Sequence, residues 1–81
     1  MPKKKRKASL EIRCRLASNV KGLRETRGYT QEGLAKLCRL NKNYISNVEQ
    51  ASVNITLANL EALAKGLGCT EEDLLRRQAI A

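Results

Sequence analysis

A stripe of hydrogen-bonding side chains runs through residues 40–50, LNKNYISNVEQ. As a helix, this segment carries Leu40, Ile45 and Val48 on one apolar face. The other face repeats polar residues at i, i+3, i+4 and i+7, namely Asn43, Ser46, Asn47 and Gln50. Solvated helices ordinarily place Lys and Glu there, because these are better helix formers than Asn and Ser. The stripe is therefore unusual for a solvated helix, and an ordinary polar surface is the alternative to a binding function.

The sequence lacks the residues that a catalytic site would need. It contains no His, no Ser or Cys beside a plausible base, and no glycine-rich loop for a phosphate. Glu71, Glu72 and Asp73 follow Thr70, where a helix is expected to begin, so the helix dipole accounts for this acidic cluster. The sequence does not indicate an enzyme.

The three cysteines do not form a recognisable site. Cys14, Cys38 and Cys69 are far apart, without a CxxC pair. A zinc site with nitrogen or sulfur ligands needs four groups, and an odd number of cysteines argues against a disulfide framework. We expect neither metal nor cofactor, and small thiols in a reducing cytosol.

The charge of the chain indicates a polyanionic partner. Its 81 residues suffice for one small domain with net charge +8. Residues 1–7 hold five basic and no acidic residues, residues 8–50 eight and four, and residues 51–81 three and four. Because no apolar run approaches the ~20 residues of a membrane span, and no basic helix carries Trp or Phe anchors, nucleic acid is favoured over a membrane.

Leu and Ala periodicity and the single Pro, at position 2, predict an all-α domain. Five helices are expected after capping residues Ser9, Thr30, Asn41, Thr56 and Thr70. The expected apolar faces are Ile12, Leu16, Val20 and Leu23; Leu34, Ala35, Leu37 and Cys38; and Leu57, Leu60, Leu63, Ala64 and Leu67. The first helix should stop at Gly28 and the fourth at Gly68. We expect a disordered basic tail at 1–8, the domain at 9–75 and a C-terminal tail at 76–81.

Only residues 39–41 separate the second and third predicted helices, which indicates a helix-turn-helix. The stretch RGYTQEGLAKLCRLNKNYISNVEQ resembles the helix-turn-helix of the Cro/cI-type family of bacterial and phage repressors, and the resemblance covers most of residues 16–75. Within that family, LNKNYISNVEQASVNITL is most similar to controller proteins of restriction–modification systems. Three residues depart from the family pattern: Gly33, where an acid is common; Arg39, where Gly is common; and Ala51, where Gly or Asn often ends the helix.

The resemblance implies a compact five-helix domain whose third helix enters the DNA major groove. Amides match adenine N6 and N7, and Lys can reach guanine, so the implied base-reading residues are Lys42, Asn43, Ser46 and Asn47. The implied phosphate contacts are Gln31, Tyr44, Gln50, Asn54 and Thr56. Three of these residues have an alternative role. Ser46 is a small residue that allows the helix to approach DNA closely, Tyr44 packs in the core, and Thr56 caps a helix.

The resemblance also implies contacts within and between chains. Residues matching Arg24 and Glu49 form a structural salt bridge in the family, which would neutralise the acid near DNA; two solvated charges are the alternative. A homodimer is implied through the fifth helix and the end of the fourth. The expected interface residues are Leu74, Leu75 and Ile80, with inward packing of Leu75 as the alternative.

These expectations describe a sequence-specific transcriptional regulator that binds a pseudo-palindromic double-stranded DNA operator as a homodimer. A restriction–modification controller is expected first, a phage repressor or antitoxin-type regulator second, and a protein-interaction adaptor is the alternative from another class. RNA polymerase is a further expected partner, and a membrane is not. The expected location is the bacterial cytoplasm, at the nucleoid, and it is the nucleus only if the basic tail is an appended import signal. The tail PKKKRK is either a native DNA-binding arm or an appended nuclear-import signal.

Overall fold

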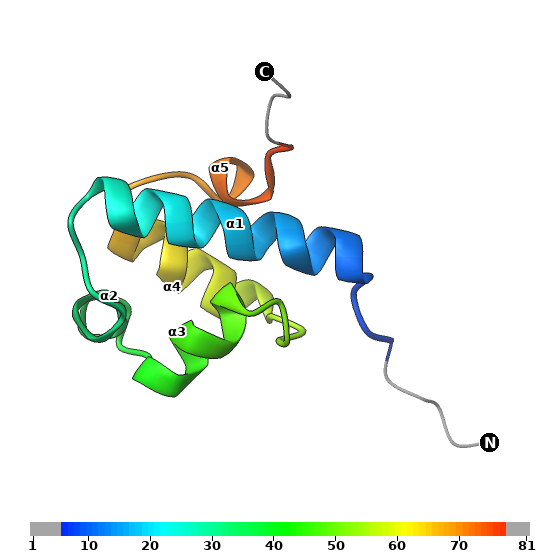
Figure 1. Ribbon diagram of the computed structural model, residues 1–81, viewed down its shortest axis with the longest axis horizontal. Helices are drawn as coiled ribbons and strands as arrows, with labels where there is room; N and C mark the ends of the chain where they lie inside the picture. The colour runs from blue at the N-terminus through cyan, green and yellow to red at the C-terminus, as the bar shows by residue number, and fades with distance from the viewer. Residues whose placement is uncertain (1–5, 78–81) are drawn as a thin grey trace.

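The computed structural model describes residues 6–77 of the chain. Its five helices are α1 (Leu10–Thr26), α2 (Gln31–Cys38), α3 (Lys42–Glu49), α4 (Leu57–Leu67) and α5 (Glu71–Leu75). The long helix α1 has α2 and α3 on one side and α5 on the opposite side (Figure 1), while α4 contacts both α2 and α5. The all-α architecture confirms the prediction from the sequence.

Each helix begins at the residue that the sequence predicts. The side chains of Ser9, Thr30, Asn41, Thr56 and Thr70 all accept a backbone N–H from the first turn. At α5 the bond is reciprocal, because the Asp73 carboxylate accepts the backbone N–H of Thr70. Hydrogen bonds from the Thr70 backbone and side chain lower the pKa of Asp73 below its ordinary value. The acid at this helix start therefore has a structural role.

One apolar core joins all five helices. Its most deeply buried side chains are Val20, Leu34, Ile45, Val48, Leu63, Leu67 and Leu74. The core expectation was wrong for Leu37 and Leu57, whose exposed fractions are 54% and 83%. Leu34, Ala35 and Cys38 already occupy the inner side of α2, which leaves Leu37 outside. Leu57 is the first residue of α4, where the chain has just left the loop, and α2 and α5 do not bury it.

Four helices end in the same way. At Gly28, Arg39, Ala51 and Gly68 the backbone is left-handed, with φ of 72°, 56°, 62° and 68°. In each case the next residue donates its N–H to a carbonyl five positions back, as in a Schellman motif. Glycine adopts this conformation without steric cost, whereas a Cβ atom costs about 1–2 kcal/mol. Arg39 and Ala51, two departures from the family pattern, are therefore strained helix ends.

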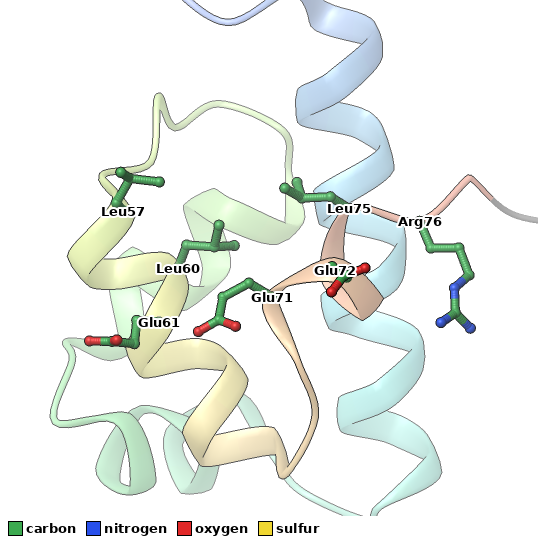
Figure 2. Close-up of a pocket in the computed structure, with 7 residues that line it drawn as sticks. All are labelled: Leu57, Leu60, Glu61, Glu71, Glu72, Leu75 and Arg76. Carbon is green, nitrogen blue, oxygen red and sulfur yellow. The ribbon is translucent and has the colours of Figure 1, made fainter.

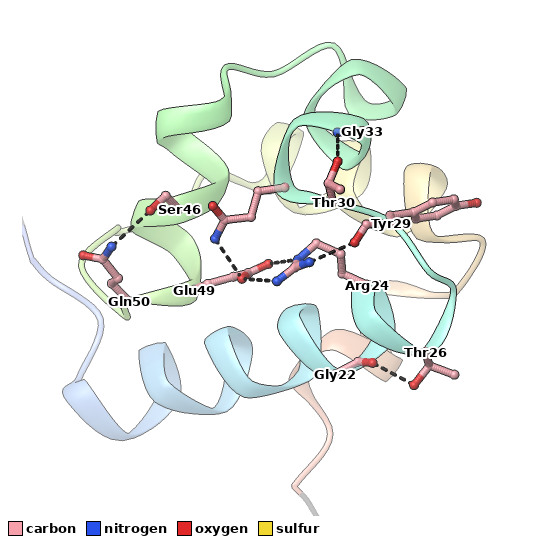
Figure 3. A network of polar contacts seen from close by, with 10 residues as sticks. Gly22, Arg24, Thr26, Tyr29, Thr30, Gly33, Ser46, Glu49 and Gln50 are labelled. Carbon is pink, nitrogen blue, oxygen red and sulfur yellow. Dashed lines mark hydrogen bonds and ion pairs between the residues drawn. The ribbon is translucent and has the colours of Figure 1, made fainter.

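An ion pair ties α1 to α3 (Figure 3). Arg24 Nε lies 2.7 Å from Glu49 Oε2, and Arg24 Nη2 lies 3.0 Å from Glu49 Oε1. The two side chains are only 12% and 4% exposed. Arg24 Nη1 donates to the Tyr29 carbonyl at 2.8 Å, and Gln31 Nε2 donates to Glu49 Oε1 at 3.1 Å. The hydrogen bonds with Glu49 raise the pKa of Arg24. One pair thus fixes the end of α3 against α1 and the start of α2.

The ion pair predicts a large penalty for removing one partner. Glu49→Gln leaves the Arg24 charge buried without its counter-ion, and should lower the free energy of unfolding by about 3 kcal/mol or more, measured in urea. Glu11→Gln is the matched control, because Glu11 is 75% exposed, and loss of its ion pairs with Arg15 and Arg77 should cost below about 0.5 kcal/mol. Equal losses in the two variants would contradict a stabilising buried pair.

The strained helix ends predict stabilisation by glycine. Arg39→Gly and Ala51→Gly should each raise the free energy of unfolding by about 0.5–1 kcal/mol, since the relief of strain exceeds the added chain entropy. Ala58→Gly, at an exposed position inside α4, is the control and should lower stability by up to about 1 kcal/mol. If all three variants lost stability alike, the left-handed ends would carry no strain.

Candidate nucleic-acid interface

The reading surface expected from the sequence lies on α3. Residues 39–41 turn the chain between α2 and α3, and the buried Ile45 and Val48 seat α3 on the core. Lys42, Asn43 and Asn47 project from the opposite side and are exposed. Within residues 6–77, these three side chains have no hydrogen-bond or ion-pair partner. Their polar groups are therefore available to another molecule.

Ser46 and Gln50 belong to the same face but contact each other. Gln50 Nε2 donates to Ser46 Oγ at 3.0 Å, one helical turn away (Figure 3). Ser46 is half-buried, whereas Gln50 is exposed. The pairing holds Gln50 along the helix, and it leaves the amide oxygen of Gln50 and the hydroxyl proton of Ser46 for other contacts.

Gln31 and Tyr44 flank the reading surface and are also held by internal bonds. Gln31 is the first residue of α2, and its amide is oriented by Glu49. The Tyr44 hydroxyl accepts a hydrogen bond from Asn59 Nδ2 at 3.0 Å, while its ring packs against the core. Accepting that bond leaves the phenolic proton free to be donated. Asn59, which the sequence did not single out, links α4 to α3.

The loop after α3 holds the start of the described chain. Asn54 accepts the Ala8 N–H through Oδ1 at 3.0 Å and donates through Nδ2 to the Arg6 carbonyl at 3.1 Å. Arg13 donates through Nε to the Ala8 carbonyl at 3.0 Å and through Nη1 to the Ala51 carbonyl at 2.8 Å. Asn54 thus has internal partners that the sequence did not predict, and its expected phosphate contact stays a prediction. Periodicity gave no signal for these bonds, because the partners of Asn54 lie more than 45 residues away.

The α5 surface differs from the expectation. Leu74 was expected at a dimer interface, but it is fully buried in the core because α5 turns that side inward against α1. Leu75 is half-buried instead, and Ile80 lies outside the described residues. Leu75 lines a shallow groove with Leu57 and Leu60, bordered by Glu61, Glu71, Glu72 and Arg76 (Figure 2). Arg76 points away from the leucines.

Other kinds of site have little support in the described part of the chain. In residues 6–77, no three His, Cys, Asp or Glu side chains are grouped so that they could hold a metal ion. Among the same residues, no helix is both long and apolar enough to cross a bilayer. Cys38 lies buried between α2 and α4 beside Gly66, and burial raises the pKa of its thiol. This cysteine contributes to packing.

Comparison with known proteins agrees with this geometry. A Neisseria meningitidis serogroup B hypothetical transcription factor is 40% identical over 65 residues, which are 80% of this chain and 61% of that protein. The control protein C.SmaI of Serratia marcescens is 38% identical over 71 residues, covering 88% of this chain and 84% of the relative. The restriction–modification controller protein C.AhdI from Aeromonas hydrophila superposes with a TM-score of 0.75 at 31% identity, covering 76% of this chain and 94% of that one.

The family model described as helix-turn-helix matches residues 20–74, which run from the middle of α1 to the buried Leu74 of α5. This span includes both helices of the motif, the ion pair that connects α1 to α3, and the exposed polar face. The chain belongs to the helix-turn-helix family of DNA-binding regulators and is homologous to the control proteins C.SmaI and C.BamHI.

Proposed function

We propose that the protein is a sequence-specific transcriptional regulator that binds a pseudo-palindromic DNA operator as a homodimer, in a restriction–modification system. The observation that supports this most is the exposed face of α3, where Lys42, Asn43 and Asn47 have no partner among residues 6–77. The acid closest to it along the helix, Glu49, is neutralised by Arg24 and would not repel phosphate. The names of the relatives C.SmaI, C.BamHI and C.MunI support the assignment to a control protein.

In this proposal α3 lies in the major groove with its first turns against the bases. Asn43 and Asn47 each present a donor and an acceptor that match adenine N6 and N7, and Lys42 reaches guanine. Ser46, half-buried and bonded to Gln50, lets the helix approach closely and can contact a base with its hydroxyl.

Phosphate contacts fix the position of α3 in the groove. Gln31 stands at the N-terminus of α2, where backbone N–H groups also face an anion. Tyr44 donates its phenolic proton, and Gln50 uses its free amide atoms at the rim. Thr56 has a sufficient role as the cap of α4, so its phosphate contact is the weakest of the set.

The second copy of the chain would cover the groove around Leu57 and Leu75. Leu57 is 83% exposed, and the groove is bordered by acidic residues on α4 and α5 and, at its edge, by Arg76, which is paired with Asp73. A two-fold axis brings such a surface against itself, so unlike charges can meet around an apolar centre. Two reading helices then face the same side of the duplex, about 34 Å apart.

The biological setting follows from the same proposal. A dimer bound at a promoter in the bacterial cytoplasm would act by blocking or contacting RNA polymerase. The protein would not be an enzyme, and its effect would come from occupancy of the operator. A protein-interaction adaptor is the rival function, and it would not require the amides of α3.

Substitution of the amides tests base reading. Asn43→Ala and Asn47→Ala should each cost about 1–3 kcal/mol at one base position per half-site, and leave folding intact because both side chains are exposed. Binding would be measured at fixed salt on the preferred duplex, its single-base variants and random DNA. Gln31→Ala provides the contrast, since loss of a phosphate contact should weaken all duplexes by similar factors. Uniform losses for both Asn variants, or none, would exclude base reading by these residues.

Substitution of an exposed leucine tests the dimer. Leu57→Glu should shift the protein to monomer in sedimentation at micromolar concentration, with an unchanged circular dichroism spectrum. Leu37→Glu is the matched control, because Leu37 is also exposed but lies on α2, away from the groove. A wild-type monomer, or equal effects of the two substitutions, would exclude this dimer surface.

A further inference from the structure

The start of the described chain is attached to the loop that follows the reading helix. The side-chain amide of Asn54 bonds the carbonyl of Arg6 and the N–H of Ala8. These are the two backbone groups that an adjacent β-strand would bond in an extended segment. The guanidinium of Arg13 makes a second attachment, because it donates both to the Ala8 carbonyl and to the Ala51 carbonyl, which lies just after α3. We call this arrangement of Asn54 and Arg13 the arm clip.

The loop itself carries no charge. Residues 50–56, QASVNIT, contain neither a basic nor an acidic residue. The arm clip sets Arg6 and Lys7, both exposed, beside this neutral loop. In Figure 1, the described start of the chain leaves α1 toward the side that carries α3, and away from α5. The clip therefore adds positive charge next to the C-terminal end of the reading helix.

We propose that Asn54 is a positioning residue for a basic arm, and that the clip holds Arg6 and Lys7 against the phosphates bordering the groove that α3 reads. This inference rests on the DNA binding proposed above. The end of a recognition helix and its following loop face the sugar–phosphate backbone, where a neutral loop offers no charge-assisted contact. Because the backbone of residues 6–8 is already fixed in the free protein, less conformational entropy is lost when Arg6 and Lys7 contact phosphates.

The salt dependence of binding gives a direct test. Each phosphate contact made by Lys or Arg contributes about 0.9 to the slope of log K against log salt. Arg6→Ala/Lys7→Ala should flatten that slope by about 1–2 on the preferred duplex, without changing which bases are preferred. Lys65→Ala removes an exposed positive charge from α4, away from the arm, and should leave the slope unchanged.

The role of the clip is tested by repeating this comparison in an Asn54→Ala background. With the arm released, the slope change caused by Arg6→Ala/Lys7→Ala should fall to well under half of its value in the wild type. Hydrogen exchange of the Ala8 amide should become faster in Asn54→Ala, while its melting temperature stays close to that of the wild type because Asn54 is exposed. This exchange measurement reports on the clip without DNA.

The outcomes separate this inference from the proposed function. If the wild type prefers one duplex and Arg6→Ala/Lys7→Ala keeps the wild-type slope, the arm makes no phosphate contact and the inference is wrong, while the regulator proposal stands. If the slope change is the same with and without Asn54, the clip does not position the arm, and the inference is also wrong. A wild type without any duplex preference would overturn the proposed function itself.

Discussion

The buried ion pair between Arg24 and Glu49 is the interaction on which the placement of α3 depends. It joins α1 to the end of α3, and its remaining hydrogen bonds reach Tyr29, before α2, and Gln31, at the start of α2. Without Arg24, Glu49 would be an uncompensated charge in a nearly closed site and would repel a polyanion. The same pair therefore holds α1 and the helix-turn-helix together, and it neutralises Glu49 beside the proposed DNA face.

The proposed DNA face contains two kinds of residue. The exposed centre of α3 has side chains that can discriminate bases, while the surrounding groups are oriented by internal bonds: Gln31 by Glu49, Tyr44 by Asn59, and Gln50 by Ser46. Contacts that only position the protein gain from such orientation, because less freedom is lost on binding. The loop after α3 carries no charge of its own. In the further inference, Arg6 and Lys7 supply the positive charge beside it, and their backbone is likewise oriented by internal bonds.

Local signals predicted the helices well. Helix starts are set by the capping hydroxyls and Asn41, and two helix ends are set by the glycines at 28 and 68. Each signal lies within a few residues of the helix end that it determines, so the sequence alone is enough to predict it. The sequence also showed that Arg39 and Ala51 depart from the family pattern, but it did not predict the left-handed backbone at these two residues. Errors arose where burial depends on distant neighbours. Leu37 and Leu57 have helical spacing but no facing element, and the partners of Asn54 come from the other end of the domain.

The central claim is that the amide face of α3 reads DNA sequence. Selection of bound duplexes from a random pool by the purified wild-type protein tests this claim most directly. The account predicts enrichment of one motif with two inverted halves centred about one helical turn apart, as the symmetry of a dimer requires. Recovery of duplexes with no common sequence, at an affinity that depends only on salt, would contradict it.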